Sequence, residues 1–118
     1  MPSDRPSATE LIETVREFLE ALRPFLSGYG AFQVRVAANL LAIAQREVEL
    51  GGGFRDAECE RLQHLLGRSA PFEELEAELV DRIRSGELDT GSDELMQHLR
   101  ATAEEHLRIA NPKYLGAR

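Results

Sequence analysis

The longest periodic stretch of the chain is residues 32–50, whose apolar side chains recur at helical spacing. At about 100° per residue they sweep an arc of roughly 200°, twice the stripe that an ordinary surface helix needs. A helix with so broad an apolar surface must be covered on two sides. We therefore expect residues 32–50 to form the central helix of a compact helical domain.

Four further helices are predicted from the same periodicity and from the residues that begin or end them. Ser7 and Glu10 form a capping box at the start of the first helix, and Pro24 ends or kinks it. Glycines 51–53 are expected to end the central helix, because three residues without side chains make continued helix costly. Gly67 is a natural C-terminal cap for the next helix. Of the last three predicted helices, the first covers about 56–66. The next has Pro71 in its first turn and is closed by Gly86, and the last is capped by Ser92 and ended by Asn111 and Pro112.

These patterns predict an all-α fold. No stretch alternates between apolar and polar residues for long enough to form a strand, and β-branched residues are few. The expected architecture is a compact helical bundle of four main helices plus one short helix, the one over 56–66. We expect a single helical domain over 1–118, with residues 1–6 flexible and the tail 111–118 packing on the bundle.

Composition excludes several function classes. The 21 acidic and 14 basic residues give a net charge of −7, which disfavours binding to nucleic acid or to anionic membranes. The single cysteine, Cys59, cannot form an internal disulfide. The sequence shows neither the apolar core of a signal peptide nor an apolar run of the roughly 20 residues that a membrane span needs. We expect a cytoplasmic protein.

A polar column lies on the arc of the central helix that its apolar surface leaves over. Arg35, Asn39 and Arg46 lie within roughly 40° of one another on the helical wheel. Three interpretations remain open: a solvated edge, an internal network that fixes helix register, or an anion-binding surface. Because Asn39 borders Phe32 and Leu50 in angle, we expect its amide to be partly buried and hydrogen-bonded.

Two other residues with reactive side chains fall on apolar stripes. His106 lies in angle between Leu95 and Leu99, which favours a core histidine with a hydrogen-bond partner over a ligand-binding group. Cys59 is in phase with Leu62, which favours a buried, inert thiol over a nucleophile. We predict no catalytic residue.

The sequence offers little support for a metal site. The Glu-x-x-His motif of carboxylate-bridged helical sites is absent, and one cysteine without clustered histidines leaves zinc without its usual ligands. Glu60/His64 and Glu94/His98 are each four residues apart, a spacing typical of charge pairs on one helix surface. We expect neither metal nor cofactor.

Four motifs, spread over essentially the whole chain, resemble a family of small bacterial all-helical proteins of unknown function. They are a pattern that begins RP-x-A-x-x-L and runs from Arg5 to Leu19, F-x-x-RVAAN-x-L-x-I-x-x-RE from Phe32, RIRSGELD from Arg82 and NP-x-YL from Asn111. The resemblance implies genes encoded beside aminoglycoside-phosphotransferase-like kinases and acyl-CoA dehydrogenases, and it supplies no activity. The family pattern falls on these residues of the present chain: Arg35, Asn39, Arg46, Glu47, Asn111, Pro112 and Tyr114.

The expected function is a non-catalytic accessory or interaction domain. By the resemblance, its partner is a phosphotransferase-like kinase or an acyl-CoA dehydrogenase-like enzyme. The alternative is a small-molecule binding protein or enzyme subunit that holds an anionic ligand on Arg35, Asn39, Arg46 and His106. We also expect a homodimer, because Phe25, Tyr29 and other apolar residues in the connecting segments exceed what a monomer usually exposes.

Overall fold

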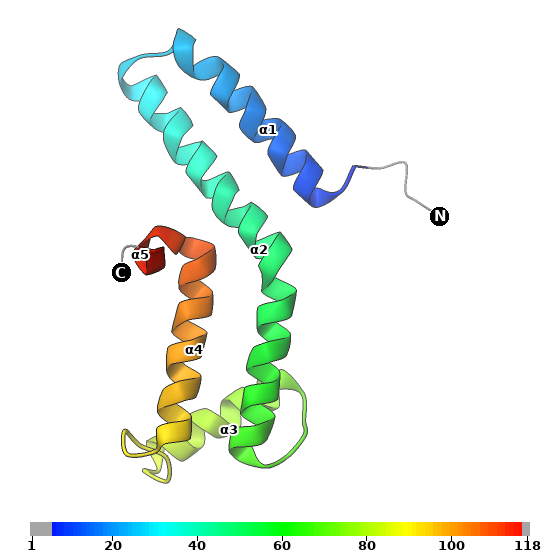
Figure 1. The fold of residues 1–118 in the computed structure, drawn as a ribbon, viewed down its shortest axis with the longest axis vertical. Coiled ribbons are helices and arrows are strands. Elements are labelled where there is room, and N and C mark those ends of the chain that lie inside the picture. The colour runs from blue at the N-terminus through cyan, green and yellow to red at the C-terminus, as the bar shows by residue number, and fades with distance from the viewer. Residues whose placement is uncertain (1–5, 117–118) are drawn as a thin grey trace.

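The computed structural model describes residues 6–116, which form helices joined by short loops and contain no strand (Figure 1). The all-α prediction is confirmed, as is the expectation of four main helices and one short helix. Residues 1–5 and 117–118, parts of the predicted flexible end and tail, lie outside the described range. In chain order the elements are α1 (Ala8–Leu22), a 3₁₀ turn η1 (Arg23–Phe25), α2 (Gly28–Leu66), α3 (Phe72–Arg84), α4 (Asp93–Ala110) and α5 (Pro112–Gly116).

Helix α2 contradicts the predicted break at the three glycines. It runs for 39 residues, without interruption, through glycines 51–53 to its left-handed cap at Gly67. The predicted central helix and the predicted short helix over 56–66 are therefore two halves of one element. The short helix of the fold is α5 instead, which begins directly after Asn111 ends α4.

The reason that α2 stays helical lies in α4, which runs beside it across the glycines. Arg46, before the glycines, donates from Nε to the Ile109 carbonyl at 2.7 Å. His64, after the glycines, has its Nδ1 2.6 Å from Glu94 Oε2 near the start of α4. Each glycine costs about 1 kcal/mol relative to alanine in a helix. Contacts to one rigid helix on both sides of the glycines offset that cost.

The molecule is more extended than the expected compact bundle. Its radius of gyration is 19.5 Å, whereas a compact domain of this length has about 13–14 Å. Figure 1 shows why: α1 packs antiparallel on the first half of α2 only, and α3 and α4 pack on the second half. The α1–α2 hairpin therefore projects from the rest of the fold.

The buried core belongs to the second half of α2 and its neighbours. Leu88 and Cys59 pack against this core as partly buried residues, and Cys59 thereby follows the apolar phase that the sequence predicted for it. Helix α1 contributes no buried residue, and α2 contributes none before Leu62. The fully buried core residues are Leu62, Leu66, Leu75, Leu79 and Leu95.

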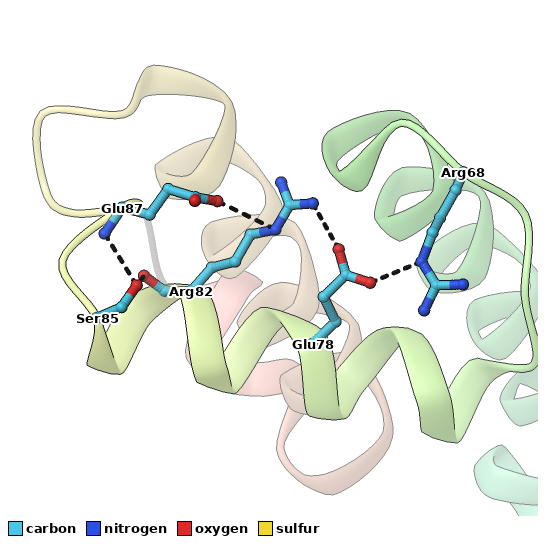
Figure 2. A network of polar contacts seen from close by, with 5 residues as sticks. All are labelled: Arg68, Glu78, Arg82, Ser85 and Glu87. Carbon is cyan, nitrogen blue, oxygen red and sulfur yellow. Dashed lines mark hydrogen bonds and ion pairs between the residues drawn. The ribbon is translucent and has the colours of Figure 1, made fainter.

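Charged side chains hold α3 in place at the end of α2. Glu78 accepts from Arg68 Nε at 2.6 Å and from Arg82 at 2.6 Å, and Arg82 also pairs with Glu87 at 3.2 Å (Figure 2). The arginines lower the pKa of the Glu78 carboxyl, with Arg68 as the largest cause. Ser85 accepts the Glu87 amide, so the network continues into the turn after α3. It fixes the α2–α3 turn and the end of α3 together.

The continuity of α2 makes opposite predictions for two of its glycines. A Cβ at Gly52 meets no atom within 4 Å, so Gly52→Ala removes only the helix cost of glycine. We expect Gly52→Ala to raise the free energy of unfolding by about 0.5–1 kcal/mol. Gly67, which caps α2, has φ +74°, a conformation that alanine adopts only with strain. We expect Gly67→Ala to lower the free energy of unfolding by about 1–2 kcal/mol. Urea unfolding followed by circular dichroism measures both, and a loss of stability in Gly52→Ala would contradict the continuous helix.

Candidate functional site

Arg61 organises the polar contacts between α2 and α4. Its guanidinium donates to both carboxylate oxygens of Glu105, at 2.8 and 3.0 Å, and to Thr102 Oγ1 at 3.1 Å. Its Nε donates to Nδ1 of His98 at 3.3 Å. The pKa of Arg61 is raised, chiefly by the hydrogen bond to Glu105. The guanidinium therefore stays charged, and its charge is matched by a two-pronged ion pair.

His98 is the buried histidine of the structure, whereas the sequence had favoured His106 for that role. Only 4% of the His98 residue is exposed, and His106 is exposed to solvent. Burial, and then the positive charge of Arg61, lower the pKa of His98, while Glu105 acts in the opposite direction. The ring is therefore neutral at neutral pH. His98 and His106 are eight residues apart on α4, so their directions from the helix axis differ by about 80°. A helical wheel of α4 alone did not show which of these directions α2 covers.

A groove lies between α2 and α4 beside this cluster. It has a volume of about 590 Å³. His64 Nδ1 lies 2.6 Å from Glu94 Oε2 across the groove. In place of the charge pairs expected within each helix, Glu60/His64 and Glu94/His98, His64 contacts Glu94 of α4 and His98 accepts from Arg61 of α2. The lining residues are Ala57, Glu60, Arg61 and His64 of α2 with Glu94, Gln97, His98 and Ala101 of α4.

The histidines and carboxylates of this groove do not form a metal centre. Within residues 6–116, no three histidine, cysteine, aspartate or glutamate side chains are placed to hold a metal ion. The groove instead combines hydrogen-bonding side chains with the apolar Ala57 and Ala101. Such a lining is typical of sites that bind small polar organic molecules.

The column of Arg35, Asn39 and Arg46 does not form one site. Arg46 is half-buried, and its bond to the Ile109 carbonyl satisfies an acceptor at the C-terminal end of α4. Arg35 and Asn39 are exposed on the hairpin half of α2. The expectation that Asn39 is partly buried is therefore wrong, because no helix covers that flank of α2. Of the three interpretations, the register network fits Arg46 and the solvated edge fits Arg35 and Asn39.

His106 and Glu47 both line a second groove, which has a volume of about 300 Å³ and lies where α3 packs near α2 and α4. Arg55 stacks over the Phe72 ring there, with the guanidinium carbon 4.4 Å from the ring centre. The remaining family-motif residues lie at the C-terminal turn. Asn111 ends α4 and accepts the Tyr114 amide at 3.1 Å, and Pro112 begins α5. These three residues shape the turn that returns the tail to α4.

The first half of α2 is covered by α1 on one side only, not on two sides as predicted. Polar contacts set the register of this hairpin: Gln45 accepts from Arg16 at 2.8 Å and donates to Glu13 at 3.2 Å. Apolar side chains away from this seam remain exposed, among them Phe18 at 62% and Leu40 at 59%. We call this surface the hairpin face, made of Leu11, Val15, Phe18, Phe25, Tyr29, Phe32, Val36, Leu40 and Val48.

A family model described as a domain of unknown function (DUF6285) matches residues 24–114. The chain belongs to this family. The match begins within η1, after α1, and ends within α5. No curated protein and no solved structure is similar enough to match the chain. Among the described residues, no helix is both long and apolar enough to cross a membrane.

Sequence reasoning missed the α2–α4 groove although both of its histidines had been noted. The available signal was the repeated Glu-x-x-x-His spacing at Glu60/His64 and Glu94/His98. Two such pairs on antiparallel helices can face each other across an interface. Recognising this requires knowing that α2 continues past its glycines and that α4 packs against that second half.

The neutral, buried imidazole of His98 predicts a pH dependence of stability. Because its pKa is lower in the folded state than in the unfolded chain, the unfolded state binds the proton more strongly. The contribution of His98 to the free energy of unfolding is complete above about pH 6.5. It is lost as the pH falls from there toward the pKa of His98 in the folded state, by at most about 1.4 kcal/mol per pH unit.

Urea unfolding at about pH 7.5, 6.5 and 5.5 measures this dependence. The matched variant is His98→Asn, whose side-chain oxygen replaces Nδ1 as acceptor for Arg61 and does not titrate. We expect a shallower loss of stability with acid in His98→Asn than in the wild type. Equal slopes in the two proteins would contradict a neutral His98.

Proposed function

We propose that this protein is a non-catalytic interaction module that associates through the hairpin face, and that its first partner is a second copy of the chain. The observation that carries the proposal is the projecting α1–α2 hairpin, which has an exposed apolar surface and no buried residue of its own. Apolar patches of this extent on soluble domains are typical of interaction sites.

Two helices alone do not bury enough apolar surface to be stable. An amphipathic helix gains most of its stability from packing, and α1 packs on α2 only. The apolar arc of α2 is wider than the stripe that α1 covers. Phe32, Val36 and Leu40 follow one another at four-residue spacing along the uncovered side, and Val48 continues the series two turns later. A second layer of helices fits this surface.

The size of the hairpin face matches a dimer contact. At the usual areas of these residue types, the exposed fractions amount to roughly 1,000 Å², against about 800 Å² per partner in a standard interface. A two-fold axis pairs a surface with itself, so one apolar face per chain is sufficient. Two hairpins then form a four-helix bundle, the packing that α1 and α2 lack in a single chain.

A hetero-partner is the second candidate. The resemblance stated above implies association with a phosphotransferase-like kinase or an acyl-CoA dehydrogenase-like enzyme. We favour the second copy because the hairpin face is self-complementary in character, apolar across both helices. A larger apolar enzyme surface can also cover it, and such a partner competes with the dimer for the same residues.

Sedimentation equilibrium tests the dimer with two double variants. Phe18→Gln with Leu40→Gln makes the hairpin face polar, and Glu17→Gln with Arg35→Gln places the same amides on exposed residues of the same helices. Neither pair changes the net charge. At micromolar concentration we expect twice the 13.2 kDa of the chain for the wild type and the second pair. The first pair is expected to be monomeric and less helical by circular dichroism. A wild type that stays at 13.2 kDa as its concentration rises would reject the homodimer.

A further inference from the structure

We propose that the α2–α4 groove is a binding site for a small ligand that carries a protonated amine beside a hydroxyl or carbonyl oxygen. The groove lies on the second half of α2, apart from the hairpin face, and the inference is independent of the proposed dimer. Its volume of about 590 Å³ is within the range of small-molecule sites.

The first element of the site is an oriented N–H group on His98. The guanidinium of Arg61 can only donate, so Nδ1 of His98 accepts the hydrogen bond at 3.3 Å. A neutral imidazole with an acceptor Nδ1 carries its hydrogen on Nε2. No buried side-chain nitrogen or oxygen of residues 6–116 lacks a hydrogen-bond partner. Since Arg61 bonds to Nδ1 only, Nε2–H of this buried ring reaches the groove that His98 lines.

The second element is the charge that remains free in the groove. The positive charge of Arg61 is engaged by both oxygens of Glu105. The carboxylates of Glu60 and Glu94 are the acidic groups of the lining. Their field attracts a cation and repels phosphate or carboxylate ligands. The groove is therefore unsuited to the anionic ligands that the sequence left open as an alternative for the Arg35 column.

The third element is the order of donors and acceptors along the groove. An ionised Glu94 only accepts, so the 2.6 Å contact places the His64 hydrogen on Nδ1. Carboxylate oxygens of Glu60 and Glu94 therefore offer acceptors for an ammonium group. Nε2–H of His98 and the Gln97 amide offer donors for a neighbouring oxygen. Ala57 and Ala101 leave room between them for a short carbon chain.

Ethanolamine is a suitable probe because it carries the amine and the hydroxyl on two carbons. The experiment follows the imidazole nitrogens of the full-length ¹⁵N-labelled protein by long-range ¹H–¹⁵N correlation at about pH 7.5. We expect the free protein to show His98 with hydrogen on Nε2. We expect saturable shifts of both His98 and His64 at millimolar ethanolamine, a range in which binding of about −4 kcal/mol is measured.

Matched probes and variants separate a site from general attraction to an acidic protein. Ethylene glycol keeps the hydroxyl without the charge, and acetate reverses the charge; neither is expected to produce saturable shifts. Glu60→Gln and Glu94→Gln are expected to weaken ethanolamine binding by at least about tenfold. Glu17→Gln removes one negative charge from α1 and is expected to leave binding unchanged. Backbone spectra of each variant report that it is folded.

Three results would overturn the site. The first is no saturable shift up to about 100 mM ethanolamine. The second is an equal loss of binding in Glu17→Gln and Glu94→Gln, which would make the effect one of net charge. The third is a His98 ring with its hydrogen on Nδ1 in the free protein. The mass measured by sedimentation bears only on the dimer, so failure of the two proposals is distinguishable.

Discussion

The continuity of α2 is the constraint on which the rest of the structure depends. A helix of 39 residues is about 58 Å long, and the longest dimension of the molecule is 58 Å. Every other main element packs on one half of this helix or the other (Figure 1). The two surfaces for which we propose binding, the hairpin face and the α2–α4 groove, therefore lie toward opposite ends of this one helix. Continuity in turn depends on α4, because Arg46 and His64 tie it to α2 on both sides of the glycines.

The two ends of α2 differ in how they satisfy their apolar surface. At the C-terminal end, α3 and α4 enclose a small leucine core, and charged networks around Arg61 and Glu78 close its edges. At the N-terminal end, α1 covers part of the apolar arc and polar residues fix the register, yet no residue is buried. The first end is a self-sufficient packing unit. The N-terminal end carries apolar side chains like those of a core, but many of them are exposed to solvent. This exposure is the physical reason for proposing a partner there.

Local signals predicted most helix boundaries, because caps and breakers act within a few residues. Ser7 and Glu10 form the predicted capping box, and Gly67 takes the left-handed conformation expected of a cap. The predicted break at glycines 51–53 is wrong because contacts distant in sequence, not local signals, decide the structure there. Whether three glycines interrupt a helix depends on what packs beside them, and α4 lies far away in sequence. The apolar arc of roughly 200° predicted cover on two sides, whereas α1 covers the first half of α2 on one side only.

The candidate site was less accessible to sequence reasoning than the fold. Arg35, Asn39 and Arg46 share a helix face, but contacts from α4 reach only Arg46. The choice between His98 and His106 depends on the direction from which α2 approaches α4, and a helical wheel drawn for α4 alone does not contain that direction. Pairing across helices, as between His64 and Glu94, likewise becomes visible only when both helices are placed.

Amide hydrogen exchange at two protein concentrations tests most directly whether a second copy covers the hairpin. In a dimer, amides of α1 and the first half of α2 are protected at high micromolar concentration and lose protection on dilution, because the hairpin depends on its partner for packing. Amides of α3 and of α2 near its buried Leu62 keep their protection at both concentrations. Protection of the hairpin amides that is strong and independent of concentration would show that the hairpin is stable alone, and would contradict this account.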